Sequence, residues 1–170
     1  MRQPRWKFTP AAALLVLAYF IYFPFGDEIR PVGRVTAIDG DTIKFDGRRV
    51  RLWGIDAPEK NQFCEKDGES HPAGLASGIH LASLIKSDQM YCRADRLDRY
   101  GREIAVCWQA GSIISLNAKM IQDGAAYPAP QYDWRSLPYV LIAALPSIQG
   151  KGLYRFDHCQ SPAEFRRSTK

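Results

Sequence analysis

Alternating apolar and polar residues predict a run of short β-strands that begins at Val32. The segment VGRVTAIDGDTIKF places an Asp-Gly pair between two β-branched runs, a strong short-range signal for a hairpin. A second pair, Asp46-Gly47, follows directly, and RRVRLWGI then alternates. That alternation puts Val50 and Leu52 on one face and Arg51 on the other. We therefore expect an antiparallel meander of three strands.

The next segment, AGLASGIHLASLIKS, changes from strand to helix periodicity. Leu75, Ile79 and Ala82 recur at helical spacing and predict one apolar helix face, continued by Ile85 or Lys86. Two strand-like runs around LDRYGR then predict a hairpin over residues 89–109.

A further helix is expected from Ser112, as its N-cap, through Ile121, with Gly124 just beyond its end. Five strands with a helix between the third and fourth are the order of an OB-type fold. The predicted fold class is therefore α+β, a five-stranded OB-type β-barrel with about three helices. One N-terminal apolar helix precedes it.

The N-terminus is typical of a targeting segment. After the basic head MRQPRWK, 18 residues from Phe8 to Phe25 carry no charge, at the lower limit for a spanning helix. No A-x-A cleavage pattern follows, which favours an uncleaved single-pass anchor at 1–30 over secretion after signal cleavage. The basic head then stays in the cytoplasm, and the domain at 31–160, with a tail at 161–170, is expected in the periplasm or outside the cell.

Composition adds little about the partner. The chain has 170 residues, 46% of them hydrophobic and 24% charged, which suits one folded domain and excludes a disordered chain. Without Arg2, Arg5 and Lys7, the net charge falls from +5 to 20 basic against 18 acidic residues, or +2. Affinity for a polyanion must therefore come from a local cluster of charge.

The four cysteines favour an exported protein with disulfides. They form no C-x-x-C motif and lie near no histidine at zinc-like spacing. Cys92 and Cys107 lie at equal distances from a hairpin centre at Arg99-Tyr100, so they are expected to face each other across the ladder and to pair. Cys64 and Cys159 are then left to form the second disulfide.

Four acidic residues are expected to converge in this topology. Asp39 and Asp41 lie at the first hairpin, and Asp56 and Glu59 follow the third strand, whose end lies near that hairpin in a closed meander. Hard carboxylate oxygens suit calcium or magnesium, which can hold a phosphoryl oxygen and position water. A remaining carboxylate can accept the proton of that water.

Two arginines complete a candidate phosphate site. Arg51 and Arg102 come from different strands and can clamp a phosphate with charge-assisted hydrogen bonds. Each feature alone has a plain alternative, since D-G-D is common in turns and an isolated arginine usually lies on a solvated strand face. The ordered combination of IDGDT, R-x-x-x-x-D-x-P-E and DRYGR favours the phosphate site.

That combination resembles the thermonuclease, or staphylococcal-nuclease-like, family from Val32 to Tyr154. The family has an OB barrel with helices. The resemblance implies that Asp41 and Asp56 are calcium-binding carboxylates and that the backbone carbonyl of Ala57 also binds calcium. It implies that Glu59 is the general base and that Arg51 and Arg102 bind the phosphate and stabilise the transition state. Arg99 and Tyr100 match residues beside the substrate phosphates.

Other segments match the family less evenly. ISLNAKMIQDGAA looks like its helix after the barrel, with Asn117 in the expected place, and KGLY stands where its last helix usually ends. Ala57 replaces a frequent threonine, which a carbonyl ligand tolerates. LPYVLIAALPSIQ is apolar where the family is charged, and Pro146 predicts a short or broken helix. Tyr127 and Tyr132 are candidates for stacking on a base, Tyr132 being the one assigned to substrate binding.

The resulting hypothesis is a calcium-dependent nuclease outside the cytoplasm, in which Glu59 activates water to cleave DNA, RNA or both. Single-stranded substrate is preferred, because an OB face accepts unstacked bases. The alternatives are a non-catalytic OB module that binds nucleic acid or protein, and an interaction domain whose acids hold a structural ion. No protein partner is predicted, and the isolated histidines are given no role.

Overall fold

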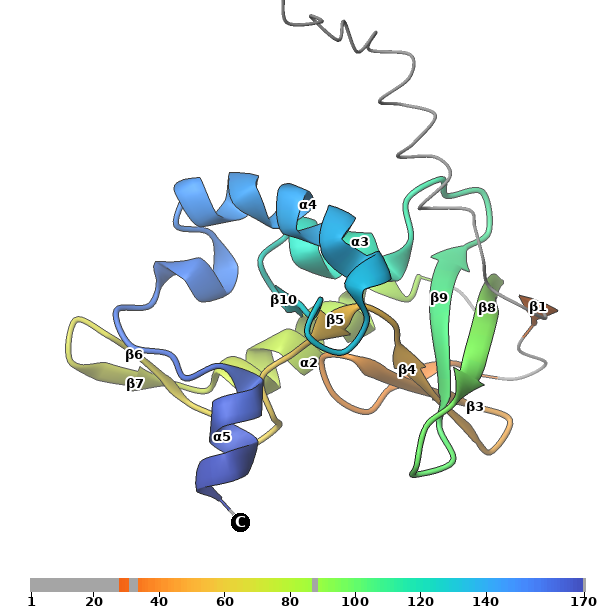
Figure 1. The fold of residues 1–170 in the computed structure, drawn as a ribbon, viewed down its shortest axis with the longest axis horizontal. Coiled ribbons are helices and arrows are strands. Elements are labelled where there is room, and N and C mark those ends of the chain that lie inside the picture. Colours follow the sequence, from red (N-terminus) through yellow and green to blue (C-terminus); the bar gives the residue numbers. More distant parts are fainter. Residues whose placement is uncertain (1–27, 31–33, 87–88, 170) are drawn as a thin grey trace, which may run out of the picture.

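The largest sheet has six strands in the order β1-β8-β9-β4-β3-β2 (Figure 1). The computed structural model describes residues 28–30, 34–86 and 89–169. The strands are β1 (Glu28–Ile29), β2 (Thr36–Ala37), β3 (Thr42–Phe45), β4 (Arg48–Leu52), β8 (Met90–Leu97) and β9 (Glu103–Gln109). Neighbours pair antiparallel except β4 and β9, which pair in parallel. The meander and the second hairpin are confirmed.

The predicted α+β, OB-like fold is confirmed in part: the sheet is mostly antiparallel, but in the described chain it does not close into a barrel. Among the described residues, β1 and β2 end the strand order and no ladder joins them, so the barrel is not closed. Gly54, at a φ of 73°, turns the chain after β4, and the next residues pair elsewhere. They form a separate two-stranded sheet from β5 (Ile55–Asp56) and β10 (Tyr127–Pro128).

A third Asp-Gly pair forms a hairpin that the sequence analysis missed. Asp67 and Gly68 both have positive φ and join β6 (Cys64–Lys66) to β7 (Glu69–His71). The neighbouring glycine and proline residues suggested only an interruption of the chain. The strands flanking this pair are polar, so the alternation that marks a half-buried strand is absent there.

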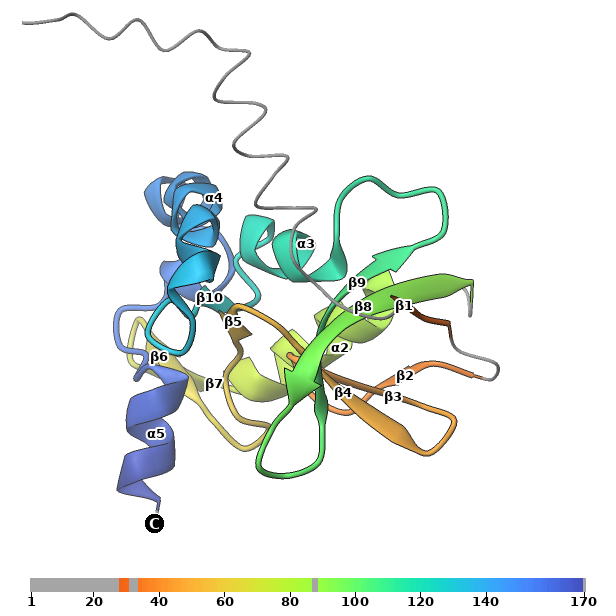
Figure 2. The same ribbon diagram turned by 45° about the vertical axis from the view of Figure 1, so that its right-hand side comes forward.

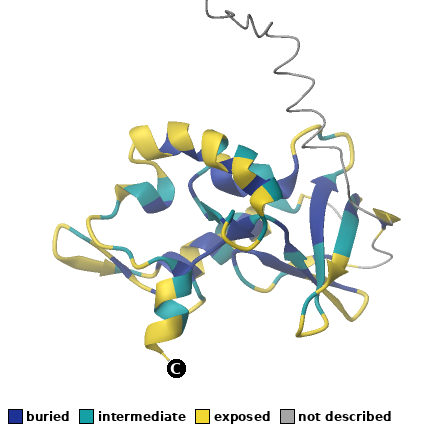
Figure 3. Ribbon diagram, in the orientation of Figure 1, coloured by how far each residue is buried: buried dark blue, intermediate teal, exposed yellow. Residues whose placement is uncertain are grey.

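Four α-helices and two short 3₁₀ helices complete the described fold. They are α2 (Ala73–Leu84), α3 (Leu116–Gln122), η1 (Trp134–Ser136), α4 (Leu137–Ile148), η2 (Gly152–Arg155) and α5 (Pro162–Ser168). The buried core lies where α2, α3 and one side of α4 meet the sheet, as the dark segments of Figure 3 show.

Helix α2 buries a different face from the one expected. Leu75 and Ile79 are exposed, and the buried positions are instead the small residues Ala73, Gly74 and Ser77, together with Leu81. Close approach of backbone explains the change: a Cβ on Gly74 would lie 1.7 Å from the carbonyl oxygen of Glu59. Only small side chains fit where this helix meets neighbouring loops.

Helix α3 begins three residues later than predicted. Ser115, not Ser112, is the N-cap and accepts a hydrogen bond from the backbone N–H of Ala118. Ser112 instead bonds the backbone of Ile114 in the preceding turn. The predicted end is confirmed, since Gly124 has a φ of 67° just beyond the helix.

Helix α4 runs through Pro146 to Ile148, so the expected break is wrong. Pro146 is buried, and only two residues follow it, so the helix loses little of its hydrogen-bond ladder. The opposite side of α4 is exposed and apolar, visible as the yellow segments in Figure 3. Lys151 of KGLY is the N-cap of η2, and the other three residues lie in η2, beyond the end of this helix.

Both expected disulfides are present, although the ladder near the hairpin turn is shifted from the expected register. Cys92 and Cys107 are directly opposed partners with Cα atoms 4.0 Å apart. The ladder nearest the turn pairs Leu97 with Glu103, one position away from the register expected there, and a bulge between Ala94 and Arg96 restores it. The second disulfide joins Cys64 and Cys159.

The predicted anchor falls largely outside the described residues. Within residues 28–30, 34–86 and 89–169, no helix combines the length and hydrophobicity needed to cross a membrane. The proposed boundaries at residues 30 and 161 stay predictions. In the structure, Glu28 and Ile29 already pair with β8.

Replacing Asn117 by alanine is expected to lower the free energy of unfolding by about 3 kcal/mol. Asn117 is fully buried and bridges three backbone groups: it accepts from the N–H of Cys107 (3.1 Å) and donates to the carbonyls of Trp53 (2.8 Å) and Ala105 (3.2 Å). Urea denaturation measures the change, with the exposed Asn61→Ala as control. A loss below 1 kcal/mol, at the lower edge of unsatisfied buried groups, would contradict this role.

Replacing Asp133 by asparagine is expected to remove a stabilising charge that depends on pH. Hydrogen bonds from Arg135 and from Trp53 Nε1 lower the pKa of Asp133 to about 2. A lowered carboxyl pKa stabilises the fold above the unfolded value near 4, and this contribution disappears as the pH falls to 2. Denaturation at pH 7 should show a loss of about 2 kcal/mol, vanishing near pH 2. An equal loss at both pH values would refute the electrostatic origin.

Candidate functional site

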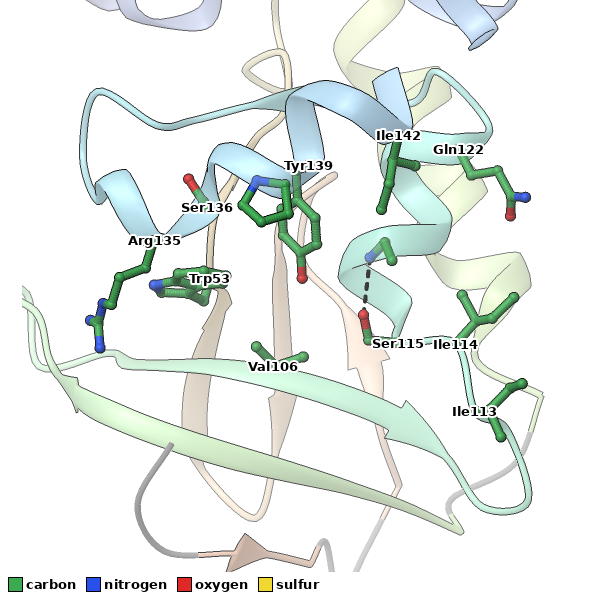
Figure 4. Close-up of a pocket in the computed structure, with 12 residues that line it drawn as sticks. Trp53, Val106, Ile113, Ile114, Ser115, Gln122, Arg135, Ser136, Tyr139 and Ile142 are labelled. Carbon is green, nitrogen blue, oxygen red and sulfur yellow. Dashed lines mark hydrogen bonds between the residues drawn. The ribbon is translucent and has the colours of Figure 1, made fainter. Parts of the chain in front are cut away.

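Two cavities of the described structure differ in chemistry. The smaller, a pocket of about 210 Å³, lies between α3, α4 and β9, and none of the described residues that line it is a carboxylate (Figure 4). Its lining is mainly apolar, as Trp53, Val106, Ile113, Ile114, Tyr139 and Ile142 show. A second cleft, of about 710 Å³, is lined by acids, arginines and tyrosines. They include Asp39, Asp41, Glu59, Arg51, Arg99, Arg102, Arg166, Tyr100 and Tyr132. The second cleft is therefore the candidate site.

Asp41 is held by its own turn and by two other segments. The carboxylate of Asp39 accepts the backbone N–H of Asp41 at 3.0 Å, which shapes the turn between β2 and β3. Asp41 is 4% exposed, and its carboxylate accepts from Arg51 Nη1 at 2.8 Å, Thr42 Oγ1 at 3.0 Å and the backbone N–H of Ala57 at 3.2 Å. Ala57 thus contacts the acid through its N–H, while its proposed role as a carbonyl ligand stays a prediction.

Asp56 reaches the same guanidinium from another strand. It lies in β5, is 2% exposed, and accepts from Arg51 Nη2 at 2.9 Å. Arg51 stands on the face of β4 opposite the buried Val50 and Leu52, as the alternation predicts. The two acids from distant motifs therefore converge on one arginine.

The charges in this cluster perturb one another. Burial raises the pKa of Asp41 to about 7, although Arg51 acts to lower it. Burial acts to lower the pKa of Arg51, but the charges of Asp41 and Asp56 outweigh it and raise that pKa. The guanidinium of Arg51 therefore favours the charged form of Asp41, and burial opposes it.

The carboxylates of Asp41 and Asp56 could supply some of the ligands of a hard cation. Carboxylate oxygens of Asp41 and Asp56 are the type that calcium and magnesium prefer, and guanidinium groups already stand against both acids. In the part of the chain that the structure describes, no three His, Cys, Asp or Glu side chains are grouped to hold an ion. A cation here would need backbone carbonyls and water as further ligands, which such ions accept.

Glu59 is placed by a buried glutamine that the sequence analysis missed. The backbone N–H of Glu59 donates to Oε1 of Gln62 at 3.1 Å, and Gln62 Nε2 donates to the carbonyl of Gln160 at 2.7 Å. Gln62 is fully buried, and Gly74 packs against the Glu59 carbonyl from the other side. An isolated glutamine in a loop carries no sequence pattern that reveals such a role.

The hairpin between β8 and β9 supplies basic and aromatic groups to the cleft. Arg102 Nε donates to Asp98 at 2.7 Å, so this arginine faces the acid of its own turn. Tyr100 is exposed, and the guanidinium carbons of Arg99 and Arg102 lie 4.8 and 5.4 Å from its ring centre. The structure therefore brings Arg102 to the same cleft as Arg51, but with a different acidic partner.

Arg166 is a second site residue, after Gln62, that the sequence did not reveal. It comes from α5, within the segment taken as a tail. Its Nη1 donates to Glu59 at 2.7 Å and to Asp56 at 3.1 Å, and its Nη2 donates to Asp56 at 2.9 Å and to Tyr132 Oη at 2.8 Å. No local motif indicates this contact, because Asp56 and Glu59 both lie more than 100 residues before Arg166 in the sequence.

One protein family and several known proteins are similar to this chain in sequence. The profile of the family described as "Staphylococcal nuclease homologue" matches residues 49–140. Protein ParB of Escherichia coli is 31% identical over 94% of this chain and 90% of its own length, and micrococcal nuclease of Shigella flexneri is 28% identical over 94% and 91%.

A third relative matches over a shorter region. The succinoglycan biosynthesis protein ExoI of Rhizobium meliloti is 37% identical over 56% of this chain, and the match spans half of that relative's length. The profile match covers more than half of this chain, and the match to ParB extends over nearly all of it. The chain belongs to the staphylococcal nuclease homologue family.

Proposed function

We propose that this protein is a calcium-dependent nuclease that hydrolyses phosphodiester bonds of DNA, RNA or both. The observation that carries the proposal is that Asp41, Glu59, Arg51 and Arg102 line one cleft, where Arg51 also donates to the buried Asp56. Membership of the family supports it, as do relatives named micrococcal nuclease and endonuclease.

Asp41 and Asp56 would hold the cation, together with the backbone carbonyl of Ala57. When bound, calcium supplies positive charge to a phosphoryl oxygen and orders a water molecule. The two aspartates lie on separate segments joined by Arg51, so their separation is set by the fold and not by one flexible loop.

Glu59 acts as the general base in this proposal. Its carboxylate accepts a proton from water while the water oxygen forms a bond to phosphorus. The bond from phosphorus to the leaving oxygen breaks, and that oxygen takes a proton from solvent. Arg51 and Arg102 donate hydrogen bonds to the phosphate oxygens, where negative charge accumulates in the pentacoordinate transition state.

Single-stranded nucleic acid is the preferred substrate in this proposal. Tyr100 and Tyr132 are exposed aromatic residues that line the cleft, and Arg99 lies beside the Tyr100 ring. Aromatic faces next to guanidinium groups can stack an unpaired base and hold its phosphate. In a duplex, the faces of each base are covered by its stacked neighbours, so this contact needs an unstacked base.

We place the domain outside the cytoplasm, held by the N-terminal apolar segment, with secretion after cleavage as the alternative. The disulfides Cys64–Cys159 and Cys92–Cys107 support this proposal, because such bonds persist in oxidising compartments.

Substitution Glu59→Gln tests the general base. The rate of DNA cleavage is expected to fall at least about 100-fold, since the amide cannot accept the proton, while substrate binding stays within a few-fold. Single-turnover kinetics measure the rate, and fluorescence anisotropy measures binding. Glu65→Gln, at an exposed position on β6, serves as the matched control. Turnover equal to that of the unmodified protein would exclude the assigned role.

Substitution Tyr100→Ala tests the stacking contact. Affinity for single-stranded DNA is expected to fall about tenfold, because loss of one stacked base costs about 1 to 3 kcal/mol. Tyr100→Phe keeps the ring and is expected to bind normally. If both variants bind like the unmodified protein, Tyr100 does not contact the substrate.

The metal dependence separates enzyme from binding module. The full chain in mild detergent is incubated with single-stranded DNA in calcium and then in a chelator. Fragments that form only with calcium support the nuclease. If the protein retains the DNA and no fragments form, the protein is the non-catalytic binding module. If the DNA is neither retained nor fragmented, the protein is an interaction domain.

A further inference from the structure

Helix α5 places one arginine in the centre of the candidate site. Arg166 contacts both Asp56, assigned to the cation, and Glu59, assigned as the base. Its two nitrogens meet the two oxygens of Asp56 as a bidentate pair, the strongest common geometry for this type of ion pair. The side chain is 32% exposed, against 3% for Asp56, so the arginine enters from the surface.

This contact competes with the proposed chemistry for the same oxygen atoms. While Arg166 donates to Glu59, that carboxylate is less able to accept a proton from water. While Arg166 bonds both oxygens of Asp56, a divalent cation cannot use them without adding repulsion between like charges. The hydrogen bonds to Asp56 and Glu59 raise the pKa of Arg166, so deprotonation does not remove the conflict.

Polar contacts between α5 and the rest of the described chain depend on one side chain, and Pro162 is the buried residue of the helix. In the described part of the chain, every hydrogen bond from α5 to another element is donated by Arg166. The helix supports its own start, because Ser161 and Glu164 form a reciprocal capping box. Figures 1 and 2 show α5 at the edge of the molecule, leading to the C-terminus.

The chain just before α5 is fixed. Cys159 is bonded to Cys64, and the carbonyl of Gln160 accepts from the buried Gln62. The helix is therefore tethered within a few residues of the acids. These bonds keep the start of α5 close to the acids even if Arg166 is displaced.

We propose that α5 is a self-inhibitory element in which Arg166 occupies the acids of the site until a divalent cation displaces it. This inference rests on the proposed function. Docking of α5 and binding of the cation then oppose each other, so the apparent affinity for the cation is reduced by the fraction of molecules in which α5 is docked. The protein requires more calcium than its acids alone would need.

Calcium titration of the full chain in mild detergent tests this element, using Arg166→Ala and isothermal calorimetry. If about one molecule in ten is undocked, the calcium concentration at half saturation should fall about tenfold. Arg166→Lys keeps the charge but loses the bidentate geometry, so its value should lie between those of the other two proteins. Arg167→Ala removes the same charge from the same helix and should leave the value unchanged.

Cleavage measured on the same proteins gives a second readout. Arg166→Ala should cleave single-stranded DNA faster than the unmodified protein at low calcium and equally fast at saturating calcium. Self-inhibition is refuted if Arg166→Ala binds calcium no more tightly than Arg167→Ala does. If the unmodified protein binds calcium and cleaves in the same experiment, the proposed function stands and self-inhibition alone fails. If no protein binds calcium or cleaves, the proposed function fails and self-inhibition fails with it.

Discussion

The site depends on the burial of two carboxylates against one guanidinium. Asp41 and Asp56 are almost inaccessible to water, and Arg51 donates to both. A buried charge without a partner is costly, so these residues are stable only while the fold keeps them together. The turn after β2, strand β4 and strand β5 therefore occupy fixed relative positions, and these positions define the cleft.

Small residues allow the surrounding segments to approach the acids. A Cβ on Gly40 would lie 2.0 Å from Oγ of Ser77, so the Asp39 to Asp41 turn packs directly on α2. Gly74 gives the Glu59 loop the same close approach one turn earlier on the helix. Helix α2 thus supports both acidic loops, which explains why it exposes larger apolar side chains and buries small ones.

Arg166 shows how charge compensation can join distant parts of a chain. The acids already share Arg51, yet Asp56 and Glu59 also accept from α5. Such a contact stabilises the resting state and opposes any ligand that needs the same oxygen atoms. The structure therefore links the C-terminal helix to the state of the site through one side chain.

Features that depend on neighbouring residues could be predicted from the sequence: the first two Asp-Gly hairpins, the faces of β4 and the β8–β9 hairpin with its disulfide. Period-two alternation and turn chemistry are local, so short stretches reveal them. The clustering of Asp41, Asp56 and Arg51 was also predictable, because hairpin order brings those strand ends together.

Four features became visible only in the folded chain: the buried face of α2, the start of α3 at Ser115, the register at the bulge and the contacts of Arg166. Each is set by contacts between segments that are distant in sequence, and hydrophobic periodicity carries no information about how closely two backbones approach. An exposed arginine in a terminal helix also looks the same in sequence whether it faces water or a buried acid.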